Sequence, residues 1–296
     1  MSFRYFGEGN DHNMQKSPYE GLQSESSETA ELLSETMVRC WLTDAFSNYK
    51  IEIYEKIDST NNRAKALAEE GEAEPTVILA NEQTSGRGRL HRQFSSPPSQ
   101  GLYMSLLCYP SLSGEKAVFL TTHTAVAVCR AIETVSGISP QIKWVNDIFV
   151  QGKKLCGILV ESSLRADGTL PYAVIGIGIN VAAQKYPPPL DQIAGSIGDF
   201  SPVPVSRNRL AAEILKELGD LAGHPPTDEH LQEYRRRSLV IGRTVRVTRG
   251  CESFLASVLD IDGDGSLIIE TEGDVQTLRA GEVSIRPECE SDENMT

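Results

Sequence analysis

The sequence predicts an α+β protein in which a mixed or antiparallel sheet packs against helices, followed by a small β-barrel. Four apolar segments with strand character follow one another between residues 142 and 180, separated by short turns. Before them, residues 115–135 keep their apolar positions at helical spacing. From residue 244 onward, short apolar runs alternate with turns, which is typical of small barrels. These patterns separate a larger mixed domain from a smaller all-β one.

The first 48 residues are expected to form an N-terminal extension and not a domain. Residues 1 to about 30 are rich in Ser, Glu, Gly and Asn, with few apolar positions, so this part is predicted to be disordered or loosely attached. Residues 31–46 carry apolar side chains at amphipathic spacing and are predicted to form one helix that packs on the body. A helix-turn-helix needs two or three helices, so none is expected here.

The main domain is expected to span residues 49–238. A strand is predicted at residues 51–54, and the polar residues 58–61 then offer several N-caps for a helix. Further strands are predicted at residues 76–80 and 102–107. The glycine- and arginine-rich loop described below lies between these two strands.

The helix expected over residues 115–135 contains His123, for which the apolar surroundings favour a structural role over a ligand role. Glycines 157, 176 and 178 lie inside the strands that follow. Glycine weakens a strand unless something lies close to the backbone, so a flat ligand is expected on this sheet. The consecutive antiparallel strands are predicted at residues 142–145, 148–150, 155–161 and 173–180.

Two amphipathic helices are expected between residues 204 and 238, at the end of the main domain. A second domain is then predicted over residues 239–288, with residues 289–296 as a tail. Its short strands are predicted at residues 244–247, 254–259, 267–270 and 275–278. The strand-forming region is predicted to finish at Ile285.

The segment Asp260-Ile261-Asp262-Gly263-Asp264-Gly265 copies the first half of an EF-hand calcium loop. However, the twelfth position of such a loop needs a bidentate Glu and here holds Thr271. Strands and not helices are predicted on both sides. The segment is therefore predicted to be a hairpin turn.

Composition excludes several classes of protein. A formal net charge of −13 argues against a chain whose main partner is DNA or an anionic membrane. The six cysteines show no CxxC spacing, no apolar run approaches the roughly 20 residues of a membrane span, and the first residues lack the apolar core of a signal peptide. A reducing cytoplasm is the expected compartment.

The segment Gly86-Arg87-Gly88-Arg89, with Arg92 close behind, is the strongest functional signal. Glycine allows close backbone approach, and each guanidinium offers a rigid fork of donors, so the loop is predicted to hold phosphate or carboxylate. It is neither a Walker loop nor a GxGxxG segment, and Gly-Arg repeats also bind nucleic acid. Lys143, about fifty residues on, supplies a second cation, although a strand lysine can also extend its amine to water.

Taken together, five motifs resemble those of biotin-protein ligases in order and approximate spacing, over roughly residues 51 to 287. The resemblance implies a class II aminoacyl-tRNA synthetase-like catalytic domain and an SH3-like C-terminal domain, in a form without the N-terminal DNA-binding domain. Val145 stands where several relatives have proline, and His91 where they have glycine. The motifs are Asp58-Ser59-Thr60-Asn61, Gln83 with Gly86-Arg87-Gly88-Arg89, Lys143-Trp144-Val145-Asn146-Asp147, residues 154–161, and Gly176-Ile177-Gly178-Ile179-Asn180.

The resemblance implies an ATP-dependent enzyme that forms biotinyl-5′-AMP and joins biotin to a lysine of the biotin carboxyl carrier protein, with Mg²⁺ as counter-charge for pyrophosphate. Lys143 and Arg89 are the expected catalytic residues. No metal ligand from the protein is assigned. Transferred by position, the biotin-binding residues are Ser59, Thr60, Asn61, Gln83, Arg87, Gly88, Arg89, Lys143 and Gly157, and the ATP or adenylate residues are Arg87, Arg89, Arg92 and Asn180.

Other functions remain open at this point. Lipoate and octanoate protein ligases share the fold, but the chain lacks their RRxGGG segment. A nonenzymatic nucleic-acid-binding repressor could use the arginine loop, yet it would not explain Ser59, Gln83 and Lys143 together. No DNA and no membrane partner is expected. Edge strands of the sheet would allow a homodimer.

Overall fold

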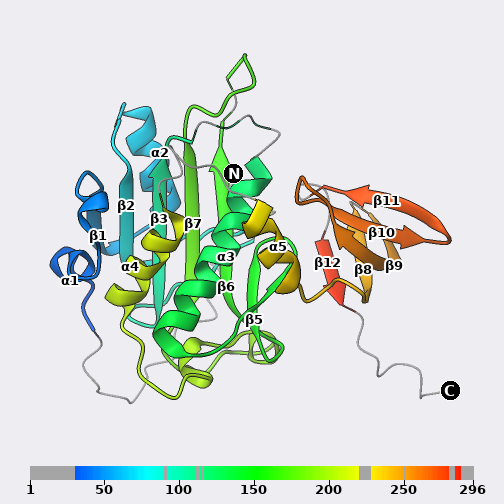
Figure 1. Ribbon diagram of the computed structural model, residues 1–296. Coiled ribbons are helices and arrows are strands. Elements are labelled where there is room, and N and C mark those ends of the chain that lie inside the picture. Colours follow the sequence, from blue (N-terminus) through cyan, green and yellow to red (C-terminus); the bar gives the residue numbers. More distant parts are fainter. Residues whose placement is uncertain are drawn as a thin grey trace, which may run out of the picture.

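The computed structural model describes residues 31–89, 92–110, 112, 114, 117–163, 165–219, 228–249, 251–279 and 284–287. In this part of the chain, a seven-stranded mixed sheet carries helices on both faces, and a five-stranded antiparallel sheet lies beside it (Figure 1). The predicted α+β fold is confirmed. Residues 1–30 and the expected tail, residues 289–296, lie outside the described residues.

The large sheet has the strand order β1-β2-β3-β7-β6-β5-β4. β1 and β2 run parallel, and the other neighbouring strands are antiparallel. A parallel pair needs a crossover, which α2 (Thr60–Glu69) supplies. The strands are β1 (Lys50–Ile57), β2 (Thr76–Gln83), β3 (Gly101–Cys108), β4 (Gln141–Lys143), β5 (Asp147–Val150), β6 (Lys153–Ser162) and β7 (Ala173–Asn180).

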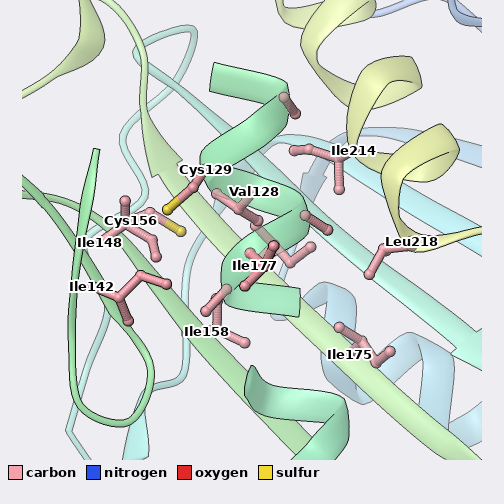
Figure 2. Packing of buried hydrophobic residues seen from close by; sticks show 14 of the residues in the cluster. Val128, Cys129, Ile142, Ile148, Cys156, Ile158, Ile175, Ile177, Ile214 and Leu218 are labelled. Atoms are coloured by element: carbon pink, nitrogen blue, oxygen red, sulfur yellow. The ribbon is translucent and has the colours of Figure 1, made fainter. Parts of the chain in front are cut away.

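Helices cover the two faces of this sheet unequally. α3 (Ala117–Ser136) and α4 (Arg207–Leu218) pack on one face, and α5 (Asp228–Arg236) packs on α3. Figure 2 shows aliphatic side chains of the sheet meeting those of α3 and α4 in the main core. On the other face, α2 forms a smaller core, leaving the rest of that face for the candidate site.

One segment of the described chain, Val118–Ser136, is long and apolar enough by length and composition to cross a membrane. Its most apolar window has a mean hydropathy of 1.2, and 67% of that window is buried inside the protein. The segment lies in α3, where the sheet and two other helices surround it. Packing in the core therefore accounts for its apolar composition.

The single helix predicted over residues 31–46 is wrong in extent. The segment forms a short helix, α1 (Glu35–Arg39), and a 3₁₀ turn, η1 (Asp44–Phe46). Glu31 stays outside the helix because its carboxylate accepts hydrogen bonds from Ser206 Oγ and the backbone N–H of Arg207, both at 2.6 Å. These bonds tie the start of the described chain to the first turn of α4, where a negative group is favourable.

The C-terminal sheet has the strand order β11-β10-β9-β8-β12 and is antiparallel throughout. β8 alternates exposed and buried residues over its first four positions, as expected of a sheet with one face on a core. The predicted hairpin at residues 260–265 is confirmed as the turn between β9 and β10. The strands are β8 (Thr244–Arg249), β9 (Glu252–Ile261), β10 (Leu267–Thr271), β11 (Asp274–Leu278) and β12 (Ser284–Pro287).

His123 lies in the core, in line with the structural role predicted for it. Its Nε2 is 3.1 Å from the carbonyl oxygen of Leu218, and its ring centroid is 4.4 Å from that of His230. Burial lowers the pKa of His123 to about 4.

Acidification should therefore destabilise the fold. In the unfolded chain His123 takes up a proton near pH 6.5, whereas in the folded chain it stays neutral to about pH 4, so about 2 kcal/mol of unfolding free energy should be lost between pH 7 and pH 5. Urea unfolding at the two pH values measures this loss. In His123→Gln, which cannot titrate, the loss should shrink by about the same amount, and an undiminished loss would contradict the assignment.

Candidate functional site

A pocket lies on the face of the large sheet that α2 partly covers. Six residues predicted from the sequence as binding residues line it: Ser59, Thr60, Asn61, Gln83, Arg87 and Gly157. The structure thus brings together residues that are almost a hundred positions apart. The remaining lining residues are Phe94, Met104, Leu159, Gly176, Ile177 and Gly178.

Strand register explains the shape of this pocket. Gly157 of β6 pairs with Gly178 of β7, and Leu159 with Gly176, and directly opposed residues point to the same face. A Cβ added at Gly176 would lie 2.1 Å from Asn61 Oδ1, and one at Gly178 would lie 2.6 Å from the ring of Phe94. Side chains of the protein itself therefore account for the glycines at positions 176 and 178. The expected ligand on this sheet stays a prediction.

Hydrogen bonds fix the start of α2 against the strands. Gln83 Oε1 accepts from the backbone N–H of Thr60 at 2.9 Å and from its hydroxyl at 3.1 Å. Ser105 Oγ lies 2.6 Å from Asn61 Oδ1 and 2.7 Å from Thr60 Oγ1. Ser59 holds the N-cap position, but its side chain makes no capping hydrogen bond. These residues do more than cap a helix: they form a buried polar wall of the pocket.

Backbone pairing holds together the two described arms of the arginine loop, residues 86–88 and 92–94. The backbone N–H of Phe94 donates to the carbonyl of Gly86 at 2.9 Å, and that of Gly88 donates to the carbonyl of Arg92 at 2.8 Å. A Cβ at position 86 would lie 2.4 Å from the carbonyl oxygen of Phe94, so only glycine fits there. His91, which stands where several relatives have glycine, lies outside the described residues.

Glu161, which was not predicted as a site residue, anchors the loop to α2. Its carboxylate lies 3.1 Å from an Arg87 guanidinium nitrogen and 2.5 Å from Lys65 Nζ, and it accepts a 2.9 Å hydrogen bond from Asn61 Nδ2. Burial acts to raise the pKa of Glu161, but the hydrogen bonds from Lys65 and Asn61 outweigh it and hold the pKa below its ordinary value. The group is therefore a carboxylate at neutral pH.

Arg89 contacts a different segment from Arg87. It donates to Asn146 Oδ1 at 3.1 Å, and Asn146 in turn donates to the carbonyl of Ile158 in β6 at 2.7 Å. Burial lowers the pKa of Arg89, while the nearby Asp147 carboxylate acts to raise it. Since the ordinary value is so high, the guanidinium remains charged. The two arginines thus tie the loop to two different parts of the structure.

Lys154, which was not predicted as a site residue, lies beside the pocket. Lys154 Nζ is 2.6 Å from an Asp147 carboxylate oxygen and 3.5 Å from the Cβ position of Gly157. Lys143 stands opposite Asp147 in the register of β4 and β5 and therefore points to the same face. It lies at the sheet edge, with its amine 5.7 Å from the centroid of the Phe149 ring.

A β-bulge explains the position of Lys154. Strict alternation would turn it away from Gly157, three residues on. In the structure, Ile148 pairs with Cys156 but Phe149 pairs with Lys154, so one extra residue is inserted in β6. A bulge of this kind redirects the side chains that precede it. The irregular pairing is set by the tertiary structure, which is why the sequence pattern did not reveal it.

Asn180 lies at the far end of the same face, two residues beyond Gly178. Its side-chain N–H donates to the carbonyl of Gly195 at 2.9 Å. Gly195 borders a second hollow, and burial raises the pKa of Tyr186 in its wall to about 12. Arg92 is exposed in the loop. The hollow is lined by Lys153, Gln184, Lys185, Tyr186, Asp191, Ala194, Gly195, Asp199 and Phe200.

The chain is similar to known proteins over most of its length. Residues 53–180 match the Biotin/lipoate A/B protein ligase family, and residues 240–286 match the Biotin protein ligase C terminal domain. The Bifunctional ligase/repressor BirA of Bacillus spizizenii is 33% identical over 259 residues, which cover 86% of this chain and 79% of that protein. The Biotin--[acetyl-CoA-carboxylase] ligase of Mycobacterium tuberculosis is 29% identical, over 85% of this chain and 95% of that protein.

Among solved structures, the biotin protein ligase of Aquifex aeolicus in complex with biotin and ATP is similar, with a TM-score of 0.69 and 26% identity. The match covers 81% of this chain and 99% of that one. The similarity therefore includes both sheets and not the larger one alone.

The hairpin geometry can be tested directly. In Gly86→Ala the added Cβ collides with the Phe94 carbonyl, so the Phe94 and Gly88 amides should exchange hydrogen about fivefold faster or more, because a hydrogen bond of this kind is worth roughly 1 kcal/mol. Hydrogen exchange resolved by NMR measures this. Ser85→Ala, at an exposed position of the same loop, is the control. Unchanged exchange in Gly86→Ala would show that the loop is looser than described.

Proposed function

Because the chain belongs to the biotin protein ligase family, we propose that it activates biotin with ATP as biotinyl-5′-AMP and transfers the biotinyl group to a lysine of the biotin carboxyl carrier protein. One structural observation supports this assignment of the site. A buried polar pocket is bordered by arginines on one loop and by a lysine of the opposite strand.

The first step needs this cationic border. The biotin carboxylate oxygen attacks the α-phosphorus of ATP, the bond from that phosphorus to the bridging oxygen breaks, and pyrophosphate leaves. Both reactants are anionic, so fixed positive groups must stabilise the charge that develops in the transition state. Arg87 and Arg89 supply guanidinium groups on the loop. Their partners Glu161 and Asn146 hold them in place before any substrate arrives.

Of the two strand lysines, Lys154 is better placed than Lys143 to contact the reacting groups. Its amine adjoins Gly157 in the pocket wall, whereas Lys143 lies beside Phe149. We propose that Lys154 contacts the carboxylate and the α-phosphate, and that Lys143, originally expected to be catalytic, contributes to the field from further away. Ser59, Thr60, Asn61 and Gln83 would hold the neutral part of biotin.

The nucleotide would extend from the loop toward Asn180. Arg92 and Asn180 border this direction, and the hollow beside Asn180 offers lysines and aromatic rings suited to a phosphate and a base. Among the described residues, no group of three His, Cys, Asp or Glu side chains could hold a metal ion. We therefore propose that Mg²⁺ enters on the phosphates of ATP, which is its usual mode of binding.

In the second step, the uncharged amine of the carrier lysine attacks the carbonyl carbon of the mixed anhydride. The carbon–oxygen bond to AMP breaks, and the nitrogen loses a proton. No enzyme nucleophile is needed, which suits the described cysteines of the core: burial raises the pKa values of Cys108, Cys129 and Cys156 and keeps them as thiols.

Several broader features are proposed with this function. The enzyme would act in the cytoplasm, without a membrane or DNA partner, and its C-terminal sheet would be SH3-like. Edge strand β1 would allow a homodimer. A specific operator shift at physiological salt would overturn the proposal of no DNA binding.

The decisive assay is ATP-dependent labelling of a purified carrier domain by biotin, beside a lipoate arm. Biotin labelling alone supports the proposal. Labelling by lipoate would favour the alternative within the same family, and binding of RNA or DNA without labelling would favour a nonenzymatic protein.

The two lysines are distinguished by substitution. Lys154→Ala should lower the rate of adenylate formation by about 10² to 10³, as expected for losing a group that stabilises transition-state charge. Lys143→Ala should have a clearly smaller effect, because Lys143 lies in the edge strand β4, one strand beyond Asp147. Single-turnover pyrophosphate release measures both. A larger loss of rate in Lys143→Ala than in Lys154→Ala would identify Lys143 as the catalytic lysine.

Arg89→Gly should release the adenylate early. The variant loses the bond to Asn146 that ties down one side of the loop, and a charged hydrogen bond of about 1.5 to 3 kcal/mol corresponds to at least roughly tenfold faster escape. Lysines of a bystander protein should then become biotinylated. Retention of radiolabelled adenylate measures the rate of escape. Retention in Arg89→Gly equal to that in Ser85→Ala would contradict this role of Arg89.

A further inference from the structure

The acidic turn between β9 and β10 has no role in the chemistry proposed above. Its Asp262 closes the turn: the side-chain oxygen accepts from the backbone N–H groups of Asp264 and Ser266, both at 2.9 Å. The backbone of Asp262 also bonds to Ser266 and Gly265. These local bonds explain the Asp-Gly pattern without a calcium ion and give the turn a fixed shape.

This turn is a contact point between the two sheets. The carbonyl of Gly265 accepts a 3.0 Å hydrogen bond from the indole Nε1 of Trp144, which is 5% exposed. Gly265 has a φ of +78°, and a Cβ there would lie 3.3 Å from Val118 and 3.4 Å from Thr122 in α3. The turn therefore presents its backbone closely to the main domain, and glycine is the residue that allows it.

Trp144 begins the four-residue segment that leads into the candidate site. The Val145 carbonyl accepts from the buried hydroxyl of Tyr234 at 2.9 Å. Asn146 exchanges hydrogen bonds with the backbone of Ile158 at 2.9 and 2.7 Å. The segment is thus held by α5, β6 and the C-terminal turn. These bonds restrict the backbone between Trp144 and the site.

The other side of this segment holds the cationic groups. Asn146 accepts the hydrogen bond from Arg89, and Asp147 pairs with Lys154 at 2.6 Å. These two contacts orient the groups that the proposed reaction needs. A displacement at Trp144 would reach them within two or three residues.

We infer that Trp144 is a positioning residue, through which the turn at residues 262–265 of the C-terminal domain orients Asn146 and Asp147 and hence Arg89 and Lys154. The C-terminal domain would then support adenylate formation without touching biotin. This inference rests on the proposed function for its kinetic readout but has a structural readout of its own.

Trp144→Phe removes the indole N–H and keeps an aromatic ring. Arg235→Gln is the matched control, because Arg235 donates to the carbonyl of Ile261 at 2.6 Å at the same boundary, a partner outside the segment 144–147. We expect kcat for adenylate formation to fall about tenfold in Trp144→Phe, with KM for biotin within about twofold, and both parameters to stay within about twofold in Arg235→Gln.

A second pair of variants tests the same contact from the C-terminal domain, at Asp262. Asp262→Asn keeps the acceptor oxygen that closes the turn and should behave as the unsubstituted protein, whereas Asp262→Ala should reproduce Trp144→Phe. Agreement between these variants would exclude a defect confined to the tryptophan ring. Equal kcat losses in Trp144→Phe and Arg235→Gln, or no loss in Trp144→Phe, would overturn the inference.

Hydrogen exchange at the Ile158 amide separates this inference from the proposed function. The amide donates to Asn146, so its exchange should speed up in Trp144→Phe and Asp262→Ala but not in Arg235→Gln or Asp262→Asn. Failure of the unsubstituted protein to form adenylate would refute the proposed function alone. Unchanged exchange in Trp144→Phe would refute the positioning role whatever the activity.

Discussion

The pairing of β7 with both of its neighbours is the constraint on which the site depends. All eight residues of β7 pair with β3, and seven pair with β6. Because side chains alternate along each strand, this register places Gly157, Gly176, Gly178 and Ser105 on one face. A slip of one residue would turn them all toward α3. The apolar residues packed on α3 and α4 therefore secure the register, and the register in turn secures the pocket.

Much of the fold follows from local patterns that the sequence displays. Helical spacing predicted α3, and alternating or apolar runs predicted the strands, because burial of one face imposes these periods. The polar residues 59–61 and Gln83 were predicted by motif, and the structure places them in one pocket. Segments that depend on distant partners were harder: Glu31, for example, is drawn out of a helix by Ser206, which is 175 residues away.

The same distinction explains which site residues were missed. Ser105 stands out only as a polar residue in an otherwise apolar strand, and Glu161 stands in a motif without an evident role. Their importance comes from Asn61 and Arg87, which the fold brings to them. Lys154 required knowledge of a bulge, since regular alternation points it the other way. Irregular pairing and long-range polar contacts are tertiary properties that residue patterns do not encode locally.

The charges around the pocket suggest why an acidic chain can join two anions. Lys65 and Arg87 meet the Glu161 carboxylate, and Arg89 and Lys154 lie near Asp147. These four cations and two carboxylates leave an excess of two positive charges. For the proposed reaction, a carboxylate and an α-phosphate would bring about two negative charges, which this excess would offset. The carboxylates also orient the cations beforehand, which reduces the reorganisation that the transition state would otherwise require.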